Sequence, residues 1–314
     1  MATDILSTLN SNSIALLHAT LVATTPLLLA AQGETLTQRA GVINIGLEGL
    51  LLCGAFAGMV GSYFTGSPLV GLLLGGISGV LLAVLFAFIT VGLAANQIVV
   101  GVGINLFATG VTGVLYRGLF GVTGQALIVA SFTPFPIPFL SDLPFLGPIF
   151  FQHTFLVYLS IFLVPFFNFF LFHTRGGLQI QAVGEHPQAA ETLGISIYWT
   201  RILTILVEGF LGGIAGSYLS LAYANTFIEG MSAGRGFIAL AIVIFGRWKP
   251  NGVFAAALFF GGATALQFHL QALGSILPYQ FVLILPYLLT LLTLAFTGVK
   301  LSAPAALGET YNRE

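Results

Sequence analysis

Long apolar runs separated by short polar segments make up most of the chain. Eight of them approach or exceed twenty residues, at 14–31, 45–64, 69–92, 97–116, 151–172, 202–224, 251–272 and 279–299. A helix needs about 20 mostly apolar residues to cross roughly 30 Å of hydrocarbon. The pattern therefore predicts an all-α polytopic membrane protein, with a single transmembrane domain over residues 1–314.

A further apolar stretch, from Phe237 to Phe245, is too short to cross the membrane as a regular helix. It lies between Arg235 and Arg247. Helices that end inside the membrane are tolerated where they line a cavity enclosed by protein, because lipid cannot bond to their free backbone groups. We expect a short or broken span near 235–247, and 8–10 transmembrane helices in all.

The basic residues predict how the chain is oriented, because cytoplasmic segments of membrane proteins carry an excess of Lys and Arg. With nine crossings and the N-terminus outside, only Arg117 and Arg235 lie in outer segments. The basic residues then on the cytoplasmic side are Arg39, Arg175, Arg201, Arg247, Lys249, Lys300 and Arg313. This bias predicts that the polar segment 173–201 and the C-terminus face the cytoplasm.

Composition excludes several other classes of protein. Charged residues make up 6% of the chain and the mean hydropathy is +1.02, whereas a soluble domain carries about 25% charged residues. No cluster of Lys and Arg exists to neutralise nucleic-acid phosphates. Cys53 is the only cysteine, so neither an intrachain disulfide nor a thiolate metal cluster can form.

The sequence contains no signature of catalysis. A phosphate-binding loop requires G-x-x-x-x-G-K-[ST], and neither Lys249 nor Lys300 follows a glycine. H-E-x-x-H, G-x-S-x-G and metal-ligand clusters are also missing from the sequence. We therefore expect that the chain is not an enzyme and binds no cofactor or metal, and that any ATP hydrolysis takes place on a separate polypeptide.

Two segments between the apolar runs are long enough to have roles of their own. The outer one, 117–150, alternates prolines with phenylalanines, which predicts a stiff, irregular loop. It is either a simple connector or a docking surface for an external partner. The inner segment, 173–201, concentrates charges and histidines and is the expected place of a cytosolic contact.

Glycine pairs four residues apart, such as Gly54/Gly58 and Gly209/Gly213, predict close helix packing.

The inner segment contains the run A-V-G-E-H-P-Q-A-A-E-T-L-G-I, residues 182–195. Pro187 suits the first turn of a helix, and Gly194 suits the position just after a helix ends. The run predicts a short cytoplasmic helix near 187–193 that lies along the membrane surface. Such a helix can insert into a cleft on a soluble partner and move as a rigid lever.

This run resembles the coupling-helix loop of ATP-binding-cassette importer permeases of the ribose and branched-chain amino-acid type. Gln188-Ala189-Ala190 followed by Gly194 has their E-A-A-x-x-x-G spacing, with Gln in the first place. Segments 37–49, 95–105 and 234–250 resemble the nucleoside branch of that family, and the resemblance extends over residues 20–305. The chain departs from it at Gln179 and Gln181, which replace arginines, and at Glu208, where relatives carry a small or polar residue.

The resemblance implies an importer with several subunits in a bacterial inner membrane. Two permease chains form the pathway, and a heterodimer with a second related permease is expected. ATP and Mg²⁺ are then bound by a cytosolic ATPase, and an extracytoplasmic lipoprotein of the basic-membrane-protein type delivers the small-molecule substrate. The residues implied in contacting the ATPase are Gly184, Glu185, Pro187, Ala189, Ala190 and Gly194.

Polar residues inside a membrane are costly, and each is therefore a functional candidate. The candidates for the substrate pathway are Asn44, Glu48, Asn96, Gln97 and Asn105. Asn44 and Glu48 are either gate residues at a helix break or, for Glu48, part of an interfacial ion-pair network with Arg39 and Glu34. The other three amides either bond to substrate hydroxyls and base edges or join neighbouring helices.

Three alternatives to a nucleoside permease follow from the same residues. A monosaccharide permease of the ribose type would share every motif, because selectivity in such systems often belongs to the delivering protein. A proton-coupled secondary carrier would use Glu208 as its titrating group. A membrane enzyme is disfavoured, because the sequence contains no catalytic constellation.

Overall fold

The computed structural model of the protein describes residues 2–121, 127–272 and 303–311, with side chains described from residue 12 onward. Within these ranges seven helices are long and apolar enough to cross a membrane. They are α1 (Ala2–Arg39, apolar from Asn12), α2 (Leu47–Thr65), α3 (Pro68–Ala87), α4 (Gln97–Phe120), α6 (Phe155–His173), α9 (Ile197–Tyr218) and α11 (Pro250–Ala272).

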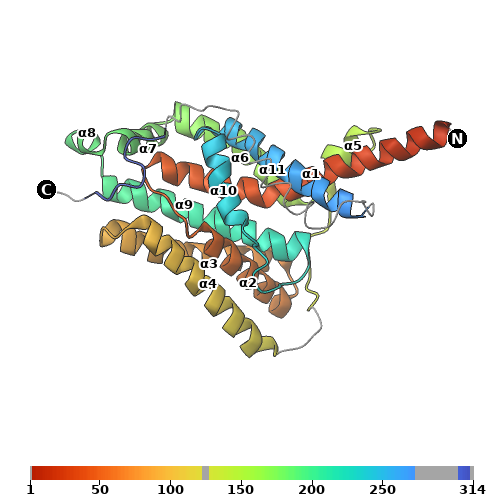
Figure 1. The fold of residues 1–314 in the computed structure, drawn as a ribbon, viewed down its shortest axis with the longest axis horizontal. Helices are drawn as coiled ribbons and strands as arrows, with labels where there is room; N and C mark the ends of the chain where they lie inside the picture. Colours follow the sequence, from red (N-terminus) through yellow and green to blue (C-terminus); the bar gives the residue numbers. More distant parts are fainter. Residues whose placement is uncertain (1, 122–126, 273–302, 312–314) are drawn as a thin grey trace.

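The predicted all-α polytopic fold is confirmed by this set of helices. Seven of the eight predicted apolar runs coincide with them, and the eighth, 279–299, lies outside the described residues. Two of the helices continue into one turn of π-helix, α3 through η1 (Phe88–Gly92) and α9 through η2 (Leu219–Tyr223). Figure 1 places the C-terminal segment 303–311 beside α7 (Arg175–Glu185) and α8 (Pro187–Thr192), at the end of the bundle opposite the start of α1.

Two predicted boundaries are corrected by the structure. The outer segment begins at residue 121 rather than 117, because α4 continues to Phe120. Arg117 therefore lies within α4, where it donates to the Gly113 carbonyl and forms an ion pair with Glu229 at 3.2 Å. The inner segment ends at Ser196 rather than 201, because the Ser196 side chain accepts a hydrogen bond from the Trp199 amide and starts α9 there.

Glycines let α2, α3 and α9 approach one another to backbone distance. A Cβ placed on Gly54 would lie 2.3 Å from the Gly213 carbonyl oxygen, and one on Gly75 would lie 1.7 Å from the Ser217 hydroxyl. Apolar surface gives no driving force between helices in lipid, so such close contacts and the hydrogen bonds between them hold the bundle together. The prediction of close packing through the glycine pairs is thereby confirmed.

Helix α4 lies at the edge of the bundle and exposes most of its surface (Figure 1). Its exposed side chains are apolar, including Leu106 and Val114, and a Cβ on Gly103 or Gly110 would meet no atom within 4 Å. An apolar face of this kind is suited to lipid or to another membrane helix. The helix therefore marks an outer surface of the bundle, not its core.

The outer segment contains more regular structure than the proline pattern predicts. Two residues on each side form an antiparallel pair, β1 (Phe135–Pro136) with β2 (Gln152–His153), and α5 (Leu146–Phe150) lies between them. The His153 ring stacks on His18 of α1 with 4.2 Å between ring centroids. The His18 Nδ1 also lies 2.8 Å from the Pro148 carbonyl. These contacts fix the loop against the first spanning helix.

Helix α10 (Arg235–Phe245) is the short span that the sequence predicts. Eleven residues make a helix about 16 Å long at 1.5 Å per residue, which is half the thickness of the hydrocarbon. The C-terminal end of α10 is fixed to α1, because the indole nitrogen of Trp248, three residues after the helix, donates to Gln38 of α1 at 2.6 Å. Because the helix is only half as long as the hydrocarbon is thick, its N-terminal end, at Arg235, lies inside the protein.

Candidate functional site

Helix α8 stands where the sequence predicts a coupling helix. It spans Pro187–Thr192 and is joined to α7 through His186. Proline is favoured at this first position, because its missing amide is not needed there. The chain turns away at Gly194, whose φ of +81° lies in the left-handed region that favours glycine. The result is a separate helical turn between two longer helices.

The six predicted coupling residues fall into two groups. Glu185, Ala189 and Gly194 are exposed, whereas Gly184, Pro187 and Ala190 are buried. The exposed group belongs to a surface that also carries Gln188, Thr192 and Leu193, and the Leu193 side chain is 80% exposed although it is apolar. A short helix with small residues and one protruding apolar side chain is suited to enter a groove on a partner.

Helix α7 attaches this surface to the end of α1. A Cβ on Gly184 would lie 2.0 Å from the Arg39 carbonyl oxygen, so only glycine fits where the two elements meet. Of the two glutamines that replace arginines, Gln181 donates to the Leu171 carbonyl of α6 at 2.6 Å. Gln179 is exposed. Only Gln179 therefore changes the surface that a partner would meet.

The internal end of α10 is capped by Glu48 of α2. The two carboxylate oxygens of Glu48 accept hydrogen bonds from the Gly234 and Gly236 amides, each at 2.7 Å. A helix N-terminus carries unpaired amides and a partial positive charge, and a carboxylate satisfies both. A Cβ on Gly236 would lie 2.4 Å from the Glu48 amide nitrogen, so the two helices touch here. Glu48 thus holds the broken helix in place.

The amides predicted for the substrate pathway gather around the turn between α1 and α2. Asn105 accepts from the Gly49 amide at 2.8 Å and donates to the Ile45 carbonyl at 2.9 Å. Gln97 accepts from the Ile43 amide at 2.8 Å. Asn96 caps its own helix, α4. The contacts of Gln97 and Asn105 are those of the alternative in which the amides join neighbouring helices, whereas Asn96 bonds only within α4 among the described residues. A part of the three amides in the substrate pathway stays a prediction.

Asn44 joins two buried carboxyl groups from different spanning helices. Its side chain donates to Glu208 of α9 at 2.9 Å, and its backbone amide donates to Glu34 of α1 at 3.3 Å. Both glutamates are fully buried, and each keeps one oxygen, Oε2, without a hydrogen bond. The ion-pair network considered for Glu34, Glu48 and Arg39 is not formed within the described residues, because Arg39 donates to the Trp248 carbonyl instead.

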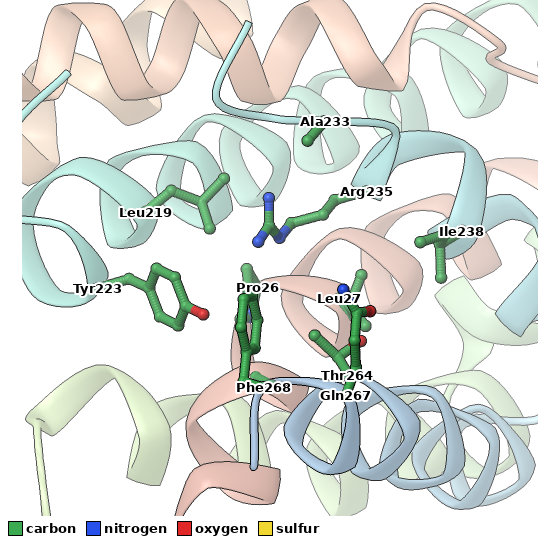
Figure 2. A pocket seen from close by; sticks show the side chains of 11 residues that line it. Pro26, Leu27, Leu219, Tyr223, Ala233, Arg235, Ile238, Thr264, Gln267 and Phe268 are labelled. Atoms are coloured by element: carbon green, nitrogen blue, oxygen red, sulfur yellow. The ribbon is translucent and has the colours of Figure 1, made fainter. Parts of the chain in front are cut away.

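A cavity of 190 Å³ lies at the internal end of α10 (Figure 2). Its polar groups come from Tyr223, Arg235, Thr264 and Gln267, and its walls from apolar residues such as Pro26 and Phe268. Figure 2 shows the Tyr223 and Arg235 side chains pointing toward one another above Pro26. The Arg235 guanidinium carbon is 5.8 Å from the centre of the Tyr223 ring. An apolar cavity with a few convergent polar groups is the usual form of a small-molecule site.

Comparison with known proteins identifies the family of the chain. The family model described as the permease component of branched-chain amino acid transport systems matches residues 16–294. The chain belongs to this permease family. Its own fold, with spanning helices and a short helix between two of them, agrees with that membership.

Three curated relatives match the permease over nearly its whole length. It is 38% identical to the guanosine ABC transporter permease protein NupQ of Bacillus subtilis, over 93% of this chain and 95% of that protein. It is 37% identical to the nucleoside ABC transporter permease protein NupC of Lactococcus lactis, over 93% and 94%. It is 36% identical to the putative glucose ABC transporter permease protein TsgC13 of Haloferax volcanii, over 95% and 98%. No solved structure matches it.

Sequence reasoning missed most of the cavity in this permease. Arg235 was considered near the outer end of its span, but Tyr223, Thr264, Gln267 and Pro26 were not. The signal available was the broken helix itself, because half-helix ends in membrane proteins commonly adjoin binding sites. Which side chains surround such an end depends on helices far apart in the sequence. Their identity required the structure.

Proposed function

We propose that this permease is the membrane-spanning subunit of an ATP-binding-cassette importer that carries nucleosides. In this account a separate cytosolic ATPase binds ATP and Mg²⁺, an extracytoplasmic lipoprotein delivers the solute, and a second related permease completes the pathway. The observation that carries the proposal is the similarity, over at least 93% of the chain, to two permeases named for guanosine and nucleosides. The short helix α8 supplies the contact through which a separate ATPase can act.

The basic residues support placing α8 and the C-terminus in the cytoplasm. Arg39 donates to the Trp248 carbonyl, between Arg247 and Lys249, and Arg201 donates to the Ala40 carbonyl. These residues therefore gather at the α7–α8 end of the bundle. An excess of Lys and Arg marks the cytoplasmic side, where an ATPase can bind and where ATP is present.

The cavity beside α10 is the place proposed for the solute on its way through. Arg235 and Gln267 can donate hydrogen bonds to base and ribose oxygens, and the Tyr223 ring offers a flat apolar face for a base. The Glu48 cap holds this end of α10 in position without lining the cavity. Motion of α10 relative to α1 would change the shape of the cavity, because each supplies part of its wall.

A glucose permease is the second candidate function, because the Haloferax relative with that name is 36% identical over 95% of the chain. The two candidates make different demands on the cavity. A base is a flat aromatic ring that can stack on Tyr223, whereas a monosaccharide presents mainly hydroxyl groups, which suit Arg235, Thr264 and Gln267. The same residues therefore serve to separate them.

Uptake with competing solutes tests the proposed substrate. The permease is produced with its partner permease, ATPase and lipoprotein in cells that lack their own nucleoside uptake, and import of labelled guanosine is measured. Unlabelled adenosine or guanosine is expected to suppress the signal, and glucose and ribose are expected to leave it unchanged. Import of labelled glucose that unlabelled glucose suppresses and nucleosides do not would instead support the second candidate, a glucose permease.

A further inference from the structure

The C-terminal segment 303–311 bonds to both helices of the coupling region. Its Ala306 amide donates to the Gly184 carbonyl of α7 at 2.9 Å, and its Ala305 amide lies 3.3 Å from a carboxylate oxygen of Glu185. Further along, the Tyr311 hydroxyl donates to the Glu191 carboxylate of α8. The same segment therefore contacts the end of α7 and the middle of α8.

Other backbone groups of this segment bond to residues at the ends of the spanning helices α1 and α9. Arg201 of α9 donates to the Glu309 carbonyl at 3.0 Å and to the Ala40 carbonyl, after α1, at 3.2 Å. The Gly308 amide donates to the Gly41 carbonyl at 3.1 Å. Gly41 itself has a φ of +86°, and a Cβ there would lie 3.0 Å from both the Ala306 carbonyl oxygen and the Arg201 guanidinium. The segment is thus fitted between α8 and the ends of α1 and α9.

Among the described residues, helix α8 also packs against α7 and α9 through the buried Ala190. It is a single turn and a half, and a helix of this length is not stable by itself in water. A cavity of 780 Å³ lies beside α8, and Glu191, Arg201 and Tyr311 line the cavity together with residues of η1 and of the start of α9. The Tyr311 ring packs against Val183, Ala190 and Ile197, which come from α7, α8 and α9. Tyr311 therefore joins α8 to α7 and α9.

We propose that residues 303–311 form a C-terminal tie that transmits movement of α8 to α1 and α9. Tyr311 is the positioning residue at the α8 end, and Arg201 is the positioning residue at the α1 and α9 end. When an ATPase displaces α8, the tie moves the turn after α1 and the start of α9. That displacement reaches the cavity through α1 and α9. The proposal rests on the proposed function, in which α8 is the contact with the ATPase.

The test separates ATP hydrolysis from solute import in the assembled importer. Tyr311→Phe removes only the hydroxyl group and keeps the ring against its apolar neighbours. Tyr198→Phe removes the hydroxyl of another tyrosine, at the start of α9 and outside the tie. Both variants are reconstituted in proteoliposomes with the ATPase, partner permease and lipoprotein, and the number of solute molecules imported per ATP hydrolysed is measured.

For Tyr311→Phe we expect normal assembly and ATP hydrolysis, with solute imported per ATP reduced roughly tenfold, as for the loss of one hydrogen bond to a charged group. Tyr198→Phe should match the unchanged protein. Glu191→Leu should reproduce the defect, and the double variant Glu191→Leu with Tyr311→Phe should be no worse than either alone, because both remove the same hydrogen bond.

Three results would overturn the tie. One is an unchanged import-to-hydrolysis ratio in Tyr311→Phe, and another is additive defects in the double variant. The third is failure of Tyr311→Phe to bind the ATPase, because Tyr311 would then belong to the docking surface. The proposed function fails separately, if the unchanged importer imports no nucleoside when it hydrolyses ATP.

Discussion

At the scale of single residues, the polar groups of the spanning core bond mainly to backbone atoms and to one another. Glu48 accepts from two amides at the start of α10, and Asn105 bonds to both sides of the turn between α1 and α2. Buried polar groups are tolerated when they are bonded in this way. These residues therefore fix the ends of the helices that they join.

The buried pair Glu34 and Glu208 gives a prediction that distinguishes an ATP-driven permease from a proton-coupled carrier. In Glu208→Gln the new amide can still accept from Asn44 and can donate to the unbonded Oε2 of Glu34. We expect nucleoside uptake to stay within about twofold of the unchanged protein, because the amide keeps the hydrogen bond from Asn44. Glu208→Ala leaves the Asn44 amide unbonded and should lower the free energy of unfolding by about 1–3 kcal/mol.

Uptake by the Glu208→Gln variant, with thermal unfolding of the purified protein, measures both effects. A carrier that moves protons through Glu208 would lose uptake completely in this variant. That loss would contradict the ATP-driven account.

Gly184 gives a second prediction, because its backbone touches the end of α1. In Gly184→Ala the new methyl group overlaps the Arg39 carbonyl oxygen, which lies 2.0 Å from the Cβ position. Overpacking of this kind costs about 1–3 kcal/mol, and α7 should separate from α1. We expect uptake to be lost while the protein still inserts in the membrane.

Gly110→Ala is the matched control, since a Cβ there meets nothing within 4 Å. It should stabilise α4 by roughly 0.5–1 kcal/mol. Uptake and membrane content of the two variants are compared in the same cells. Equal uptake in Gly184→Ala and in the control would mean that the contact of α7 with α1 is not needed.

At the scale of helices and loops, two short helices carry the functional account, α8 on the surface and α10 inside the bundle. Each begins where the chain would otherwise leave amides unbonded. Proline begins α8, and the Glu48 carboxylate caps α10. The two elements lie in different parts of the bundle, so their predictions are separate.

The exposed tip of α8 is predicted to be part of the ATPase contact. Leu193→Asp places a charge where an apolar side chain is 80% exposed, so the permease itself should fold normally. A charge in an apolar groove of the partner is unfavourable, and the ATPase should bind at least tenfold more weakly. The measurement is copurification and affinity of the ATPase for the permease in detergent.

Leu178→Asp is a matched control, because Leu178 of α7 is also exposed and lies outside α8. It should bind the ATPase more tightly than Leu193→Asp does. Unchanged binding by the Leu193 variant would remove α8 from the contact.

The cap on α10 gives a prediction at the cavity. Glu48→Ala leaves the Gly234 and Gly236 amides without their bonds, and loss of a helix cap costs about 0.5–2 kcal/mol. We expect a lower unfolding temperature and an at least fivefold loss of uptake, because α10 supplies Arg235 to the cavity. Glu48→Asp should recover part of both. A variant that lost uptake with an unchanged unfolding temperature would indicate a direct gate role for Glu48 instead.

The elements differ in how far the sequence predicts them. Long apolar runs predict the spanning helices, because a membrane requires that length, and Pro187 with Gly194 predicts the limits of α8 to within one residue. Helix α7 was not predicted, although Gly177, Ile180 and Val183 recur on one buried face. Its two glycines at the start and its many polar residues obscured that pattern.

The cavity and the C-terminal tie were beyond sequence reasoning for a different reason. Tyr223 and Gln267 come together only when η2 and α11 are placed on either side of α1. The tie is held chiefly by backbone carbonyls, such as those of Gly184 and Gly41. Backbone groups are present at every position, so no residue type marks these contacts in the sequence.

At the scale of the whole molecule, the bundle joins a surface lever to an internal cavity through α1 and α9. Helix α1 ends and α9 begins at the C-terminal tie, and the cavity is lined in part by α1 and by η2, which continues α9. Glycine contacts between α2, α3 and α9 make these helices one closely packed unit. A displacement at the α7–α8 end can therefore change the cavity without any covalent chemistry in this chain. This linkage connects the proposed ATPase contact to the proposed solute site.

Nucleoside import into proteoliposomes tests this linkage. The permease, its partner, the ATPase and the lipoprotein are present, and the proton gradient is dissipated. We predict import that requires ATP hydrolysis, persists without the gradient, and disappears when Leu193→Asp separates the permease from its ATPase. Import that continues without the ATPase, or that stops when the gradient is removed, would contradict the account.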